Sequence, residues 1–295
     1  MKPPPFDYYN PSSIDEALMH LAEHGYDAKA LAGGQSLIPM MNFRLAQPAV
    51  LVDINNISEL AYIRPDEQGG LRLGAMTRHY QVEHDPLVAE RAPLLSEAMP
   101  QIATTQIRSR GTFGGSIAHA DPSAELVAIS VALDGRFHLR SRSGTREVNA
   151  ADFFLGMFTT QLEPEELLVE VSLPPIPMRT GWALKEIARR PHDFALVGVA
   201  ALVSLDNRDH INDARIVLFS VGDGPVSAQK AAGVLKGQPP TSDLIIAAAE
   251  SAGTDDIDPS SDIHASAAYR RHLVKVLTRQ ALEKALERAR VSANQ

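Results

Sequence analysis

The sequence predicts an α+β protein, with an N-terminal α/β region in two parts and a C-terminal domain of three-stranded antiparallel sheet with helices. Up to about residue 176, short apolar strand candidates alternate with helical patterns. A proline-rich stretch at 174–177 ends this region, and three long strand candidates followed by helices come after it. Strands that alternate with helices favour an α/β architecture, and a run of strands followed by a run of helices favours an α+β architecture. We therefore expect divisions at 1–57, 58–176 and 177–295.

Composition excludes several classes of function. The chain has 295 residues, 44% hydrophobic residues and a formal net charge of −8, which argues against a protein that binds the nucleic-acid backbone. It has no cysteine, so thiolate iron–sulfur sites, cysteine-based zinc sites and cysteine nucleophiles are impossible. A zincin-type metal site needs two histidines four residues apart with a carboxylate beside them, and we expect no such site in this chain. We find no apolar segment typical of a signal peptide or a membrane span and expect a cytoplasmic protein.

The first part reads as a small α/β unit. Prolines make residues 1–11 extended. An amphipathic helix follows, with a capping signature from Ser12 to Asp15 and Gly25 at its C-terminal end. Strands are expected at 28–32 and 49–54, with a short helix at 37–45 between them.

The second part combines hairpins with helices. Segments 60–63 and 71–75 flank a glycine turn, and 135–140 and 145–148 flank another, which predicts two β-hairpins. Helices are expected from 77 to 84, from 87 to 105 with breaks at Pro93 and Pro100, and from 123 to 133. Residues 167–173 alternate as a half-buried strand.

The C-terminal part predicts three antiparallel strands at 181–188, 194–205 and 214–221, with a turn at 206–209. Helices are expected at 227–236, 242–252 and about 265–290. We expect Asp262 to cap the last helix.

Two glycine pairs stand out, Gly33-Gly34 within 32–39 and Gly114-Gly115 within 111–125. Adjacent glycines let the backbone approach a ligand closely, and exposed N–H groups in such a turn suit an anion. The simpler interpretation of either pair alone is a tight turn. Neither the G-x-G-x-x-G nor the P-loop pattern is present.

Four motifs together resemble one family. They are Ala32-Gly33-Gly34-Gln35-Ser36-Leu37; Gly74-Ala75-Met76-Thr77; Thr112-Phe113-Gly114-Gly115-Ser116 with Asp121-Pro122-Ser123-Ala124-Glu125; and Lys185 to Arg189 with Asp193-Phe194-Ala195. In this order they resemble the FAD-binding medium subunit of molybdenum hydroxylases, the carbon monoxide dehydrogenase and xanthine dehydrogenase type. The resemblance covers essentially the whole chain.

The resemblance implies that the two glycine loops hold the FAD pyrophosphate. Side-chain donors would come from Gln35, Ser36, Thr112 and Ser116, whose simpler interpretation is that they cap loops. In full, the resemblance implies cofactor contacts from Ala32, Gly33, Gly34, Gln35, Ser36, Leu37, Ile102, Thr112, Gly114, Gly115, Ser116, Glu125, Leu168 and Lys185.

Four of these contacts would lie apart from the glycine loops. Glu125 matches an acidic residue that contacts FAD, although a carboxylate in the first turn of a helix also has a structural use. Leu168 aligns with a leucine near the flavin, although a strand leucine also fits a plain core position. Lys185 matches a lysine near the flavin ring, where a cation would stabilise negative charge on the reduced flavin. Ile102 falls where some relatives place an aromatic residue against the ring.

The implied function is electron transfer within a larger complex. In the family, a large molybdenum-cofactor subunit oxidises the substrate, and a small subunit with two [2Fe–2S] clusters supplies electrons to the FAD subunit. That subunit passes them to an external acceptor. We therefore expect a heterotrimer, and a dimer of heterotrimers, without catalytic or metal-ligating residues in this chain. The alternatives are a stand-alone FAD-dependent oxidase or reductase with a related (PCMH-type) FAD fold, and a nucleotide-binding scaffold module.

Overall fold

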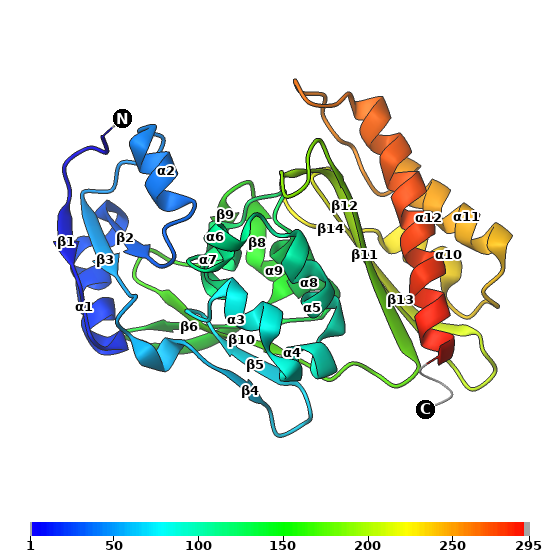
Figure 1. The fold of residues 1–295 in the computed structure, drawn as a ribbon, viewed down its shortest axis with the longest axis horizontal. Coiled ribbons are helices and arrows are strands. Elements are labelled where there is room, and N and C mark those ends of the chain that lie inside the picture. Colours follow the sequence, from blue (N-terminus) through cyan, green and yellow to red (C-terminus); the bar gives the residue numbers. More distant parts are fainter. Residues whose placement is uncertain (1, 292–295) are drawn as a thin grey trace.

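The computed structural model describes residues 2–291, and Figure 1 shows three sheet-containing regions in sequence order along the long axis. The N-terminal region lies at one end, the middle region in the centre, and the C-terminal strands and helices at the other end. The mixture of helices and sheets confirms the predicted α+β class. No helix within residues 2–291 is long and apolar enough to cross a membrane.

Three short parallel strands form the N-terminal sheet in the order β1-β3-β2. The predicted helices and the two apolar strands are present, and β1 adds a third strand within the segment expected to be extended. Leu18 and Leu21 of the first helix pack with Val50 and Val52 in one core. The elements are β1 Asp7–Tyr9, α1 Ile14–His24, η1 Gly25–Asp27, β2 Ala28–Leu31, α2 Leu37–Asn42 and β3 Val50–Asp53.

The cap of α1 differs by one residue from the prediction. Ser13 is the N-cap, and its Oγ accepts a hydrogen bond from the Glu16 amide at 3.2 Å. Ser12 instead donates its amide to the Glu16 carboxylate at 2.8 Å, and Asp15 pairs with Arg140. The predicted end at Gly25 is confirmed, with a φ of 52° that glycine adopts without a Cβ clash.

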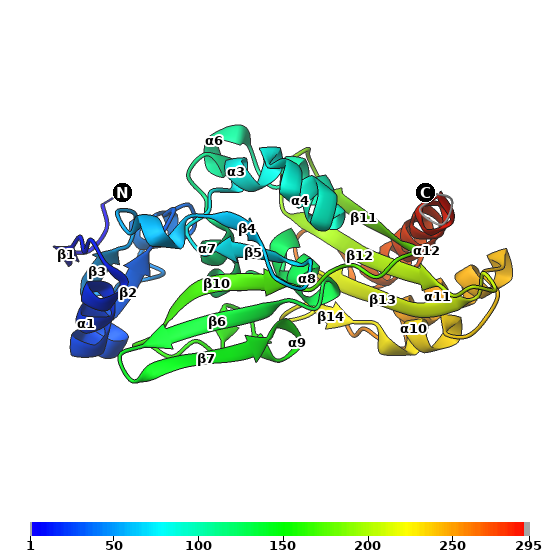
Figure 2. The ribbon, with the colours of Figure 1, turned by 90° about the horizontal axis from the view of Figure 1, so that it is seen from below.

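An antiparallel sheet in the order β4-β5-β10-β6-β7 forms the centre of the middle region. Both predicted hairpins are present, as β4–β5 and β6–β7. Figure 2 shows the strands of this sheet side by side, with helices α3, α4 and α6 above them. The bounds are η2 Ser58–Leu60, β4 Ile63–Pro65, β5 Leu71–Gly74, β6 Arg136–Ser141, β7 Gly144–Asn149, α9 Ala150–Phe153, β8 Phe154–Gly156, β9 Thr159–Thr160 and β10 Leu167–Leu173.

The helices of the middle region are short, because prolines and turns divide them. Pro86 and Pro93 each occupy the first turn of a helix, where a missing N–H costs nothing. The stretch 111–125, expected to be a loop, contains a helix, α7. The helices are α3 His79–His84, α4 Pro86–Arg91, α5 Pro93–Ala98, η3 Met99–Gln101, α6 Thr105–Arg108, α7 Phe113–His119 and α8 Glu125–Ala132.

The C-terminal sheet has four strands in the order β11-β12-β13-β14, one more than predicted. The two-residue β14 is too short to leave a period-2 pattern. One face of the sheet packs against α10 and α12, which α11 covers in turn, and the other face joins the core of the middle region through Leu184, Ala200 and Phe219. The bounds are β11 Thr180–Ala188, β12 Ala195–Leu205, β13 Ile211–Phe219, β14 Val226–Ser227, α10 Gln229–Leu235, α11 Ser242–Thr254 and α12 Ala267–Val291.

Asp262 does not cap α12. Its Oδ1 accepts from the amides of His264 and Ala265 in the preceding turn, and its Oδ2 pairs with Arg270 at 2.7 Å. Ser266 takes the capping role, since its Oγ accepts from the Tyr269 amide at 3.2 Å. Asp262 therefore fixes the approach to the helix instead of its first turn.

Candidate functional site

The first glycine segment, residues 32–37, connects β2 to α2. Gly34 has a φ of 71°, in the left-handed region, and the Gln35 side chain donates to the Gly33 carbonyl at 3.0 Å. The backbone N–H groups of residues 34–37 donate no hydrogen bond to any atom of residues 2–291. Consecutive N–H groups without partners around a left-handed residue form a concavity that suits an anion. We call this stretch the open segment.

The Asn55 side chain, just after β3, holds the open segment, and Arg78, just before α3, holds Asn55. Asn55 Nδ2 donates to the Ala32 carbonyl at 2.8 Å, and Asn55 Oδ1 accepts from Arg78 Nη2 at 2.6 Å. Arg78 also donates to the Arg110 carbonyl. Burial and the neighbouring charge of Arg110 lower the pKa of Arg78. Sequence reasoning missed Asn55, Arg78 and Arg110, because only the fold brings these positions together.

In the second glycine segment, residues 112–116, the backbone N–H groups of residues 113–116 do have hydrogen-bond partners, in contrast to those of the open segment. Thr112 is the N-cap of α7, and its Oγ1 accepts from the Gly115 amide at 3.2 Å. The Phe113 amide donates to the Thr77 carbonyl and the Gly114 amide to the Ala75 carbonyl, each at 2.9 Å. Its first-turn N–H groups are therefore already used. We call this stretch the closed segment.

Glycine permits close backbone approaches in both segments. A Cβ on Gly33 would lie 2.3 Å from the Arg110 carbonyl oxygen. A Cβ on Gly115 would lie 3.5 Å from Ala32 Cβ, and one on Gly114 would lie 2.4 Å from Ala75 Cβ. The structure therefore brings Gly115 of the closed segment within van der Waals distance of Ala32 in the open segment, whereas the tightest approaches of Gly33 and Gly114 are to Arg110 and Ala75, outside the two segments.

A buried histidine supports the closed segment. His79 Nε2 lies 2.9 Å from the Thr112 carbonyl oxygen, and its Nδ1 is buried without a hydrogen-bond partner among the described residues. Burial lowers the pKa of His79 to about 4, aided by Arg108 and Arg78 and opposed by the bond to Thr112. The imidazole is therefore neutral near pH 7 and donates to Thr112 through Nε2. Nothing in the sequence pattern marks His79 for this role.

Glu125, the first residue of α8, follows the closed segment by nine residues. Its side chain is buried, and burial, with a contribution from Asp121, raises its pKa to about 7. Burial and the charge of Glu125 raise the pKa of Glu186 in β11 to about 8. Two neighbouring carboxyl groups from two regions thus lie in a poorly solvated place, where a second negative charge is costly.

The remaining predicted residues are more scattered. Ser116 is half-buried on α7, and its hydroxyl has no hydrogen-bond partner among the described residues. Ile102 and Leu168 are buried in the core of the middle region. Lys185 pairs with Val199, and alternation along β11 places it on the opposite face from Glu186, the face where Ala183 and Ile187 pack against the helices.

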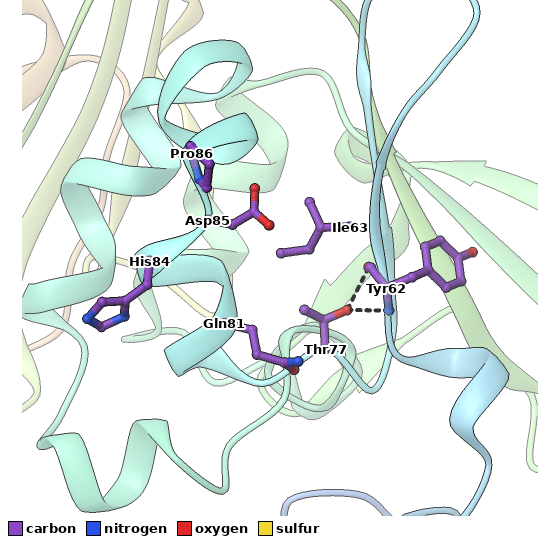
Figure 3. A pocket seen from close by; sticks show the side chains of 7 residues that line it. All are labelled: Tyr62, Ile63, Thr77, Gln81, His84, Asp85 and Pro86. Carbon is purple, nitrogen blue, oxygen red and sulfur yellow. Dashed lines mark hydrogen bonds between the residues drawn. The ribbon is translucent and has the colours of Figure 1, made fainter.

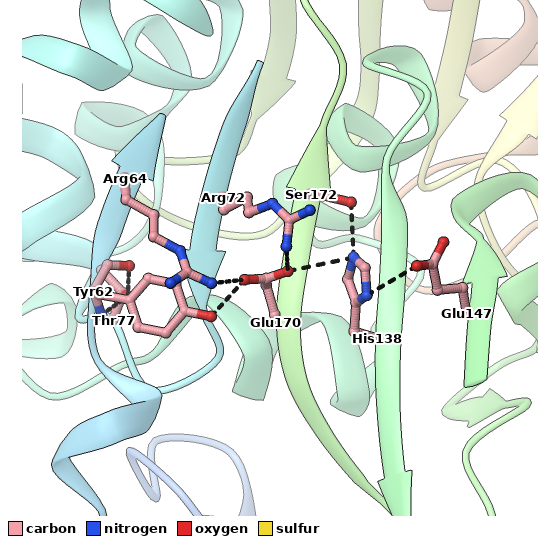
Figure 4. A network of polar contacts seen from close by, with 8 residues as sticks. All are labelled: Tyr62, Arg64, Arg72, Thr77, His138, Glu147, Glu170 and Ser172. Carbon is pink, nitrogen blue, oxygen red and sulfur yellow. Dashed lines mark hydrogen bonds and ion pairs between the residues drawn. The ribbon is translucent and has the colours of Figure 1, made fainter. Parts of the chain in front are cut away.

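A polar network on the middle sheet lies outside the predicted site (Figure 4). The buried Glu170 carboxylate accepts from Tyr62 Oη at 2.6 Å, Arg64 at 2.9 Å and Arg72 at 3.0 Å. Burial alone would raise the pKa of Glu170, but the hydrogen bonds from Tyr62 and Arg64 and the nearby cations hold it below its ordinary value. His138 Nε2 of β6 lies 3.5 Å from the same carboxylate. Because Arg64, Arg72, His138 and Glu170 come from β4, β5, β6 and β10, the network ties the sheet together.

A cavity of about 310 Å³ lies between β4 and helices α3 and α4 (Figure 3). Its lining contains none of the predicted site residues. The Thr77 hydroxyl on its wall donates to the Tyr62 carbonyl at 2.8 Å. The lining residues are Tyr62, Ile63, Thr77, Gln81, His84, Asp85 and Pro86.

The open segment has the hydrogen-bond donors and the backbone shape that the phosphates of FAD require. A diphosphate needs several donors and close backbone approach, and the N–H groups of residues 34–37 together with the Gly34 conformation provide both. The closed segment adds the free hydroxyl of Ser116 but no first-turn amide. The expectation that both loops offer backbone donors is therefore revised, because α7 uses its first-turn amides within the protein.

Known proteins match the chain from end to end. The model of the FAD binding domain in molybdopterin dehydrogenase matches residues 4–176, and the model of the CO dehydrogenase flavoprotein C-terminal domain matches residues 182–285. The 6-hydroxypseudooxynicotine dehydrogenase complex subunit alpha of Paenarthrobacter nicotinovorans is 41% identical over 98% of this chain and 97% of its own length. The carbon monoxide dehydrogenase medium chain of Hydrogenophaga pseudoflava is 38% identical over 98% and 99%, respectively.

Solved structures agree with these matches. A chain of carbon monoxide dehydrogenase from Hydrogenophaga pseudoflava superposes with a TM-score of 0.94 at 39% identity, covering 98% of this chain and 99% of that one. A chain of quinoline 2-oxidoreductase from Pseudomonas putida 86 gives a TM-score of 0.92 at 38% identity, with the same coverage. The chain therefore belongs to the FAD-binding medium subunits of the molybdenum hydroxylase family, which are subunits of oxidoreductases.

Proposed function

We propose that this chain is the electron-transfer subunit of a heteromeric molybdenum hydroxylase. It accepts electrons from the [2Fe–2S] clusters of a partner subunit and passes them to an external acceptor. The observation that carries the proposal is the run of partner-free amides at residues 34–37, set against the closed segment in a member of an FAD-binding family. When bound, FAD supplies the redox chemistry, and the protein supplies position and electrostatics.

Each predicted residue has a specific place in this proposal. The amides of the open segment hold the diphosphate, with Gln35, Ser36 and the Ser116 hydroxyl as further donors. Thr112, Gly114 and Gly115 shape the closed segment so that its backbone lies against Ala32. Ala32, Gly33, Gly34 and Leu37 complete the open segment. Glu125, Ile102, Leu168 and Lys185 are proposed as contacts further along the cofactor.

The proposed partners follow from what the chain lacks and from its relatives. Without cysteine it cannot ligate a conventional iron–sulfur cluster, so the electron relay must lie on another polypeptide. We propose a large molybdenum-cofactor subunit and a small [2Fe–2S] subunit, assembled as a dimer of heterotrimers in the cytoplasm. Relatives named as the medium chain or a complex subunit support this assembly.

Affinity purification of the tagged chain from its native host tests the proposal. We expect flavin absorption bands in the purified material and co-purification of a molybdenum-containing and an iron–sulfur subunit. Recovery of a lone flavoprotein that is fully active would favour the stand-alone oxidase or reductase. A purified chain that shows no flavin bands after saturation with FAD would contradict the cofactor assignment itself.

A further inference from the structure

Helix α1 carries three potential metal ligands on one face. His20, Glu23 and His24 stand at positions i, i+3 and i+4, so their side chains project from adjacent turns. One potential ligand atom from each residue lies within 4.8 Å of the others. The order is H-x-x-E-H, a histidine pair with a carboxylate beside it, which the expectation of no metal site overlooked.

The aromatic ring of Tyr9, in β1, orients the two imidazoles. It stacks on His20 with ring centroids 4.1 Å apart and on His24 with centroids 5.5 Å apart, at interplanar angles of 21° and 24°. A ligand pair held by ring packing loses little side-chain freedom when an ion binds.

Each imidazole also has an unsatisfied nitrogen. His20 Nδ1 and His24 Nε2 are buried and have no hydrogen-bond partner among the described residues. A buried polar atom without a partner costs free energy, and coordination of an ion by an imidazole nitrogen removes part of that cost. The exposed Glu23 carboxylate leaves the cluster open to solvent, so an ion can enter.

We propose that His20, Glu23 and His24 bind one divalent transition-metal ion of the Zn²⁺ class. Two imidazoles and one carboxylate suit Zn²⁺, Cu²⁺ or Ni²⁺, whereas Ca²⁺ and Mg²⁺ require a shell of oxygen ligands. Three protein ligands leave at least one position for water. Because no hydrogen bond orients the second nitrogen of His20 or His24, we expect an affinity about 10- to 100-fold below that of a site whose histidines have such bonds. The site stabilises the contact between α1 and β1 and is independent of the proposed electron transfer.

Titration of the metal-free full-length chain with Zn²⁺, followed by calorimetry and by the melting temperature, tests this proposal. We expect one equivalent of Zn²⁺ to bind and to raise the melting temperature, because an ion that binds only the folded state stabilises it. Co²⁺ should give visible d–d bands from an imidazole-containing site. Binding should weaken on acidification, since the ligands must be deprotonated.

Single variants locate the ion. His20→Gln and His24→Gln should each weaken Zn²⁺ binding by at least about tenfold, which corresponds to about 1.4 kcal/mol. Glu23→Gln alters an exposed side chain, so it keeps the fold and should weaken binding by a smaller factor. His84→Gln is the matched control, because the His84 ring also lies against a tyrosine and beside a glutamate, but His84 belongs to no such ligand cluster among the described residues. Zn²⁺ binding that survives in both histidine variants, or that is lost in His84→Gln, overturns the proposal.

Discussion

The open and closed segments contain the same glycine pair but use it differently. In the open segment, Gly34 takes a left-handed conformation and the following amides have no partner. In the closed segment, Gly114 and Gly115 are helical, and their amides bond to Ala75 and Thr112. The first pair therefore combines a close approach at Gly33 with exposed donors from Gly34 onward, whereas the second pair serves close packing alone. A Gly-Gly dipeptide indicates that a side chain at that position would clash. It does not indicate whether the clash would be with a bound ligand or with another part of the protein.

The largest expected effect is at the closed segment. A Cβ on Gly114 would lie 2.7 Å from Ala75 Cα, so Gly114→Ala must move backbone. We expect a loss of about 3 kcal/mol in the free energy of unfolding, measured with urea. Gly233→Ala, in α10 with nothing within 4 Å of the new methyl group, should stabilise by up to about 1 kcal/mol. Equal stability of the two variants would break the assignment of the closed segment to packing.

The next effect is the acid sensitivity of the closed segment. The pKa of His79 is about 4 in the folded protein, and in the unfolded chain it returns to the ordinary histidine value of 6.5. Between these values the unfolded chain binds more protons, so stability falls as the pH drops from 6.5 to 4. The loss amounts to about 3 kcal/mol. His79→Gln should flatten this part of the stability–pH curve, and an unchanged slope would show that His79 is solvated.

At the open segment the expected effect is on cofactor affinity. Gly34→Ala places a Cβ 3.2 Å from Ile38 and strains a φ of 71°, so the neighbouring amides must shift. We expect FAD affinity to fall about tenfold, or about 1.4 kcal/mol, in fluorescence titration. The matched control is Gly237→Ala, which has a similar φ of 78° and open space around the methyl group. Both variants should lose stability, but only Gly34→Ala should lose FAD affinity. A similar loss of affinity in Gly237→Ala would show that the open segment has no special role in binding FAD.

The smallest expected effect is that of Ser36→Ala, which tests whether backbone amides or a side chain bind the diphosphate of FAD. Ser36 is exposed, and its side chain makes no cap to α2. If the amides bind the diphosphate, Ser36→Ala should change FAD affinity by less than about threefold, or about 0.6 kcal/mol. A tenfold loss would show that the Ser36 hydroxyl, rather than the amides of the open segment, is a main donor to the diphosphate.

Much of the fold followed from local patterns. The long strands, the two hairpins and α1 each carry a periodic pattern that burial on one face imposes. The errors fell where local patterns are weak: the cap at Ser13, the two-residue β14, and α7, where glycines hide the helical signal. The division of the chain into 1–57, 58–176 and 177–295 stays a prediction.

The sequence by itself determined the class of protein, the family and the two glycine segments, because these depend on residue types in a fixed order. Only the tertiary structure decided which segment offers its amides. In the closed segment, the partners of the amides are Ala75 and Thr77, which lie in the turn after β5, and Thr112, the cap of α7. Likewise, the burial of His79 and the contact of Asn55 with Ala32 depend on residues distant in sequence. A hydrogen bond needs two groups at the right distance, and when those groups are far apart in the sequence only the folded chain shows which of them meet.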